Sequence, residues 1–80
     1  MIDSVILEGI AQVAQKHLGW RGPLTADMRL VEDLRLDSVR LLTLAAEVEN
    51  RFRVLLDEAD ELAIETVGDL VAIVRRKLGA

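Results

Sequence analysis

Residues 34–39 read Leu-Arg-Leu-Asp-Ser-Val, and a long run with helical apolar spacing begins where they end. This change from loop to periodic sequence predicts a helix that begins at Ser38. The first backbone N–H groups of a helix have no partner inside it, and the helix dipole is positive at that end. A hydroxyl at this position is therefore well placed to carry an anionic group such as a phosphodiester. Taken alone, an Asp-Ser pair is also a common helix cap.

The predicted helix runs from about Ser38 to Phe52. Leu41 and Leu44 fall partly off its inward stripe, so some apolar surface is expected to stay exposed. The positions expected to face inward are Val39, Leu42, Ala45, Ala46 and Phe52.

An earlier helix is predicted before this one. Asp3 or Ser4 can cap it, and Gly19 is a natural C-terminal stop. Three- and four-residue steps place its apolar face at Val5, Leu7, Ile10, Val13, Ala14, His17 and Leu18.

A long connection joins the two helices, from Gly19 to Asp37. Its Gly22-Pro23 pair excludes a continuous helix. Loops of this length in small domains are usually functional or held down by their own side chains. Four apolar residues are expected to pin this loop across the bundle: Leu24, Met28, Leu30 and Leu34.

The last third of the chain predicts a short acidic segment and a final helix. Residues 57–62 suit either one or two helical turns or a solvated loop. Thr66 and Asp69 form a variant of the capping box before the final helix. The helix carries apolar residues at Val67, Leu70, Val71, Val74 and Leu78, and its basic end is Arg75, Arg76 and Lys77. The fold class is all-α, a small four-helix bundle of three main helices and one short helix.

Composition restricts the function. The chain has 80 residues, enough for one domain over 1–80, and no cysteine for disulfides or thiolate metal sites. A net charge of −4 argues against nucleic-acid binding, and no apolar run is long enough for membrane insertion. The start, Met1-Ile2-Asp3, lacks the basic region of a signal peptide, so we expect a cytoplasmic protein.

Catalysis and metal binding have little support. His17 is the only histidine, and without cysteine it cannot complete a nucleophile, base and orienting group. We therefore expect no enzyme activity and assign His17 to packing or a helix-end contact. The acidic residues 57–61 lack the alternating ligands and central glycine of a calcium loop.

Residues 31–39, Val-Glu-Asp-Leu-Arg-Leu-Asp-Ser-Val, resemble the attachment motif of acyl carrier proteins. The likeness continues through Glu49, Phe52 and the acidic turn after Leu56 to residues 64–67, without a gap from Glu32 onward. This resemblance implies a four-helix bundle that is phosphopantetheinylated on Ser38. It implies that the arm, derived from coenzyme A, holds an acyl group as a thioester.

The resemblance also implies partners and contact positions. A phosphopantetheinyl transferase would load Ser38, with Asp37 beside the phosphate, where it helps to hold magnesium in the transferase complex. Acyl-loading and acyl-processing enzymes would read the helix that starts at Ser38, at Val39, Arg40, Leu41 and Leu44. We expect a monomeric, free-standing protein.

Two departures from the family pattern bear on function. Arg35 stands where the family usually has glycine, so either a costly backbone conformation or another loop path is expected. Between Arg35 and Arg53 there are three acids and four bases, so the recognition helix is not acidic. The charge favours a dedicated pathway, such as a specialised lipid or a polyketide, over housekeeping fatty-acid synthesis. An aminoacyl or peptidyl carrier and an unmodified helical interaction module remain as alternatives.

Overall fold

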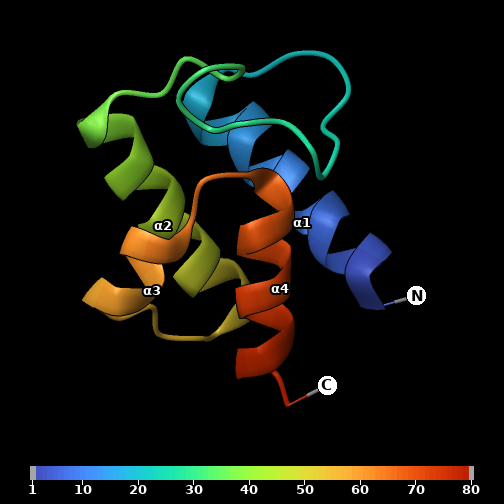
Figure 1. Cartoon of the computed structure of the whole chain (residues 1–80). Helices are drawn as coiled ribbons and strands as arrows, with labels where there is room; N and C mark the ends of the chain where they lie inside the picture. Colours follow the sequence, from blue (N-terminus) through green and yellow to red (C-terminus); the bar gives the residue numbers. More distant parts are fainter. Residues whose placement is uncertain (1, 80) are drawn as a thin grey trace.

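Four helices form the fold in a computed structural model that describes residues 2–79. They are α1 (Ile2–Leu18), α2 (Ser38–Phe52), α3 (Glu58–Ala63) and α4 (Val67–Lys77). Within residues 2–79 no strand occurs, apart from one isolated bridge between Arg29 and Thr66. Figure 1 shows the loop between α1 and α2 crossing one end of the bundle, and α3 lying as a short element beside α2 and α4. The predicted all-α class, with three main helices, one short helix and a long loop, is confirmed.

The N-terminal end of α1 differs from its prediction, and the C-terminal end agrees with it. The structure is already helical at Ile2, so the prediction that Asp3 or Ser4 caps this helix is wrong. Asp3 instead lies in the first turn, and its carboxylate binds the Arg75 guanidinium at 2.7 Å, which ties the start of α1 to the end of α4. Gly19 ends the helix as predicted, in a left-handed conformation with φ +68° that costs glycine little.

The inward faces of α1 and α2 differ in part from the predicted ones. Val5 is 65 % exposed, whereas its neighbour Ile6 is fully buried. In α2 the predicted positions Val39, Leu42 and Ala46 face solvent, and the buried residues are Leu44 and Val48. Both sets recur at helical spacing, so periodicity alone does not choose between the two faces.

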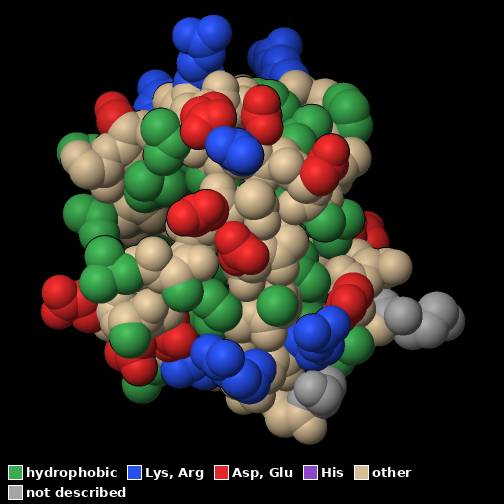
Figure 2. Space-filling view, viewed as in Figure 1, with side chains coloured by type: hydrophobic (Ala, Val, Ile, Leu, Met, Phe, Trp, Pro, Cys, Tyr) green, Lys and Arg blue, Asp and Glu red, His purple; other side chains and the backbone are tan. Residues whose placement is uncertain are grey.

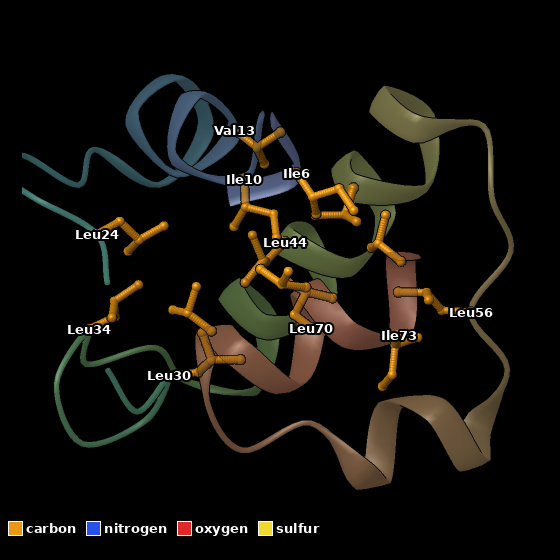
Figure 3. Close-up of a cluster of buried hydrophobic side chains, with 14 of the residues drawn as sticks. Ile6, Ile10, Val13, Leu24, Leu30, Leu34, Leu44, Leu56, Leu70 and Ile73 are labelled. Atoms are coloured by element: carbon orange, nitrogen blue, oxygen red, sulfur yellow. The ribbon is translucent and has the colours of Figure 1, made fainter. Parts of the chain in front are cut away.

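The core is almost entirely aliphatic and draws on all the long helices and on the loop (Figure 3). Leu24, Leu30 and Leu34 are buried and Met28 is half-buried, so these residues pin the loop as predicted. Leu36 is buried too, at 4 % exposure, which the spacing of the loop leucines did not predict. The loop is therefore a packed segment and its path is fixed up to the start of α2.

Backbone hydrogen bonds join this loop to the start of α4. The Leu30 N–H donates to the Glu65 carbonyl at 3.0 Å, and the Val67 and Gly68 N–H groups donate back to loop carbonyls at 2.9 and 2.8 Å. These bonds satisfy N–H groups that the first turn of α4 would otherwise leave free. The loop thus positions the beginnings of α2 and α4 together.

Of the two alternatives for residues 57–62, the structure shows the helical one, α3, which runs from Glu58 to Ala63. Asp57 caps α3, and Asp60 completes a capping box by accepting the Asp57 N–H. The Asp60 carboxylate is also buried against α4, where Lys77 Nζ lies at 2.7 Å and Arg76 at 3.2 Å. The basic end of α4 is therefore a set of ion pairs and not only a helix terminus.

The predicted cap of α4 is confirmed. The Thr66 hydroxyl accepts the Asp69 N–H at 3.1 Å, and the Asp69 carboxylate accepts the Thr66 N–H at 3.1 Å. The N–H groups of Glu65 and Thr66, which both donate to this carboxylate, hold the pKa of Asp69 below its usual range. Of the predicted inward residues only Leu78 is exposed, at 43 %, and Ile73 is buried in addition.

Candidate functional site

Ser38 is the first residue of α2 and is exposed to solvent. The cap of this helix is the residue before it. The Asp37 carboxylate accepts the Arg40 N–H at 2.8 Å, and the Asp37 carbonyl accepts the Leu41 N–H at 2.9 Å. Within residues 2–79 the Ser38 hydroxyl makes no hydrogen bond, so it is not needed to cap the helix.

The segment that leads to Ser38 is rigidly placed. Leu34 and Leu36 are buried, and the Leu36 N–H donates to the Leu30 carbonyl at 3.1 Å. Arg35 between them is exposed and has φ +59°, the left-handed conformation. Of the two expected outcomes at this position, the structure shows the first: the backbone keeps the conformation that glycine adopts cheaply, at a cost for a residue with a Cβ.

A pocket of about 300 Å³ opens beside Ser38. It lies between α2 and α3, with Leu30 from the loop and Leu70 from α4 also lining it. Leu44 and Leu70 are fully buried, whereas Leu62, Glu58 and Glu61 are exposed. An apolar interior with a polar margin is typical of a site that takes up an apolar group.

The four predicted docking residues do not share one environment. Val39 is 70 % exposed and Arg40 is exposed as well, so both are accessible at the start of α2. Leu41 is half-buried and lines the pocket. Leu44 is only 2 % exposed, so its assignment as a surface contact is wrong, because the face of α2 that carries it packs on the core.

Two leucines near this site are exposed, although the sequence predicted Leu42 to face inward and gave no role to Leu62. Leu42 is 62 % exposed on α2, and Leu62 is 78 % exposed on α3. Leu42 follows Val39 by three residues, which is the spacing of one helix face and was a usable signal. Leu62 had no such signal, since its position depends on how α3 packs against α4.

His17 makes the helix-end contact that was one of its two expected roles. Its Nε2 atom lies 3.3 Å from a Glu47 carboxylate oxygen, in an exposed contact between α1 and α2. Among residues 2–79 no group of three or more histidine, cysteine, aspartate or glutamate side chains is arranged to hold a metal ion. No helix in the same range is long and apolar enough to cross a bilayer.

Comparisons with known proteins identify the family that has this fold. Residues 4–74 match the family model described as "Phosphopantetheine attachment site". The chain belongs to the acyl carrier protein family. The acyl carrier protein of Thermotoga maritima is 41 % identical over 75 residues, which are 92 % of this chain and 93 % of that protein.

Two mycobacterial proteins are also similar. The meromycolate extension acyl carrier protein of Mycobacterium tuberculosis is 29 % identical over 72 residues, which are 89 % of this chain and 63 % of that protein. A solved structure of a candidate acyl carrier protein from M. tuberculosis superposes with a TM-score of 0.83 and 34 % identity, over 89 % of this chain and 96 % of that one. The four-helix fold described above is therefore the acyl carrier protein fold.

The family match indicates a covalently attached 4′-phosphopantetheine. The residues described here fit such a group. An exposed serine hydroxyl stands at a helix N-terminus, where the N–H groups of Ser38 and Val39 have no acceptor inside the helix. An apolar pocket opens next to the same hydroxyl. The electrostatics of the helix end favour an attached phosphodiester, and the pocket suits an apolar cargo.

Proposed function

We propose that this protein is a carrier without catalytic activity of its own, which holds an acyl intermediate on a phosphopantetheine arm attached to Ser38 and presents it to partner enzymes. The observation that carries the proposal is the state of Ser38. Its hydroxyl is exposed, is not used as a cap, and borders the apolar pocket. When bound, the group supplies a thiol on a long flexible arm, and an acyl chain is held there as a thioester.

Attachment needs only the side chain that Ser38 offers. Its oxygen bonds to the phosphorus of the phosphopantetheinyl group, the proton leaves the hydroxyl, and coenzyme A loses adenosine 3′,5′-bisphosphate. Asp37 lies directly before this oxygen and uses only Oδ1 to cap α2. Its second carboxylate oxygen is therefore available for a cation supplied by the transferase complex.

The interaction-module alternative assigns Ser38 to capping, and that role belongs to Asp37. The aminoacyl or peptidyl alternative is less well matched to the pocket, whose interior is lined by leucine, isoleucine and alanine side chains. Each methylene of an acyl chain that leaves water for such a pocket gains about 0.8 kcal/mol. The pocket therefore supports an acyl cargo.

A specialised lipid pathway is the assignment that we favour. The meromycolate extension carriers, which are 28–29 % identical to this chain, bear the name of a specialised lipid process. The charge of α2 supports the same assignment. Arg40 stands at the start of the helix, where fatty-acid carriers are usually acidic or neutral. A polyketide pathway is the second possibility within the same proposal.

The test is the intact mass after incubation with coenzyme A and a phosphopantetheinyl transferase. The wild type should gain one phosphopantetheinyl group, and Ser38→Ala should gain none. Ser4→Ala is the matched control, since Ser4 is the other serine of the chain and is also exposed. Loading of Ser38→Ala, or loss of loading in Ser4→Ala, would overturn the assignment of Ser38.

The pocket is tested separately with loaded protein. An octanoyl arm should raise the melting temperature above that of an acetyl arm, because only the longer chain reaches into the apolar interior. Ala45→Leu places bulk in the pocket and should remove most of that difference. Equal melting temperatures for the two arms in the wild type would show that the pocket does not shelter the chain.

A further inference from the structure

The outward face of α2 is apolar beside Ser38. Val39, Leu42 and Ala46 lie three and four residues apart, and all three are exposed. We name these three residues the α2 face. Leu62 stands across the pocket from it, 78 % exposed on α3. Hydrophobic side chains gather over the region of α2 and α3 in Figure 2.

Both acidic residues of α2 interact with other residues of the same chain. Glu47 lies 3.3 Å from His17 of α1. Glu49 is half-buried and accepts the Leu56 N–H at 2.8 Å. Glu47 lies off the spacing of the α2 face. Glu49 continues that spacing three residues after Ala46, but its carboxylate is engaged by the Leu56 N–H, so the helix offers no free acid there for a basic partner.

The basic residues near Ser38, in contrast, have no partner among the described side chains. Arg35 and Arg40 are exposed, and within residues 2–79 neither guanidinium has an ion pair or a side-chain hydrogen bond. Arg51, on the same helix, is hydrogen-bonded to Gln12 of α1 and therefore faces away from the α2 face. The positive charge available to a partner is thus concentrated at the Ser38 end of α2.

The opposite margin of the pocket is acidic. Glu58 and Glu61 of α3 are exposed and line the pocket mouth. Arg35 and Arg40 do not line the pocket themselves. A partner that covers the pocket mouth and also reaches the start of α2 would meet negative charge on the α3 side and positive charge beside Ser38. Such an asymmetric pattern selects one orientation as well as one kind of partner.

We propose that the α2 face docks on a partner enzyme whose arm-receiving entrance is apolar and carries aspartate or glutamate opposite Arg40, with Arg35 as a second contact. The proposal rests on the carrier function above and adds the chemistry of the partner. Charge complementarity identifies the occupant, because a basic patch at this position would face two free guanidinium groups and would be repelled. The apolar centre supplies affinity, and the arginines set association rate and register.

The experiment uses one transferase in two forms as the probe partner. The first form has a lysine- and arginine-rich carrier-docking surface, and in the second those residues are changed to glutamate. Loading rates at low protein concentration, which report kcat/KM, are measured for the wild type, Arg40→Glu and Arg51→Glu in low and high salt. Arg51→Glu is the matched control, since it makes the same charge change at the far end of α2 from Ser38, where the side chain is hydrogen-bonded to Gln12 of α1.

The wild type should be loaded faster by the acidic form, and Arg40→Glu should reverse the preference by up to about tenfold at low salt. The difference should shrink at high salt, and Arg51→Glu should behave as the wild type. Equal preferences for Arg40→Glu and the wild type, or an equal effect of Arg51→Glu, would overturn the proposal. If no form loads Ser38 at all, the carrier function fails instead, which distinguishes the two claims.

The apolar part is tested with Val39→Asp, against Val5→Asp as control. Both residues are exposed on helices, at 70 % and 65 %, but Val5 lies on α1 outside the proposed contact. Val39→Asp should slow loading by both transferase forms, because it puts a charge in an apolar contact. If Val5→Asp slows loading as much as Val39→Asp does, the α2 face is not the docking surface.

Discussion

Replacing Arg35 by glycine should make the protein more stable. Arg35 has φ +59° and is exposed, so its side chain gains nothing from burial that would offset its backbone conformation. A residue with a Cβ pays about 1–2 kcal/mol in this left-handed region. Glycine loses about 0.5–1 kcal/mol more chain entropy on folding, which offsets part of the gain. We expect a net stabilisation of about 0.5–1 kcal/mol, and for a chain of this length a rise in melting temperature of about 2–8 °C.

Thermal unfolding followed by circular dichroism measures this change. Arg35→Ala is the control, because it removes the same charge and keeps the Cβ. The alanine variant should stay within about 0.5 kcal/mol of the wild type, as an exposed substitution usually does. If Arg35→Gly melts no higher than Arg35→Ala, the left-handed backbone carries no such cost and the reasoning is refuted.

Three further predictions concern the stability of the fold. Thr66→Ala should lower the free energy of unfolding by about 1 kcal/mol without changing the loading of Ser38; an unchanged urea midpoint would show that the cap contributes nothing. Gly9→Ala should cost about 1–3 kcal/mol, because its new Cβ would lie 2.5 Å from the Phe52 ring, and Phe52→Leu should recover part of that loss in a double-mutant cycle. The hydrogen bond from Lys77, followed by the Asp57 N–H, holds the pKa of Asp60 below its ordinary value of 3.8. Stability from Asp60 is therefore present above that pH and is lost as the pH falls through the lower pKa of the folded state. Asp60→Asn should flatten this part of the acid unfolding curve, and an identical curve would contradict the role of the ion pair.

Local signals in the sequence were sufficient for much of the fold. Gly19, the change at Asp37 and the Thr66 capping pattern each act within a few residues, and the corresponding helix ends are where these signals placed them. The spacing of leucines in the loop also predicted that the loop packs against the bundle.

Tertiary contacts decided what the sequence did not show. The helix α2 has apolar residues on two faces, and the core selects Leu44 and Val48 over Val39 and Leu42. The short helix α3 is held by Asp60 and its partners at the end of α4, far along the chain. The pocket beside Ser38 depends on which face of α2 is buried and on where α3 packs. Its position could therefore not be predicted from periodicity.

The attachment motif was the most informative part of the sequence, and its setting needed the structure. The motif singled out Ser38, whereas only the geometry shows that Asp37 caps α2 and leaves the serine hydroxyl free. In the same way, a count of charges found the surplus of arginine on α2. The structure separates Arg40, which is exposed beside Ser38, from Arg51, which is engaged with α1.

The most direct test of the account is the mass of the protein purified from its native cells. We expect a phosphopantetheinyl group on Ser38 and, in part of the molecules, an added acyl chain that hydroxylamine releases as expected of a thioester. Peptide mapping should place both on the peptide that contains Ser38. A protein in which Ser38 is uniformly unmodified, or in which the group is attached elsewhere, would contradict the claim that this chain is an acyl carrier through Ser38.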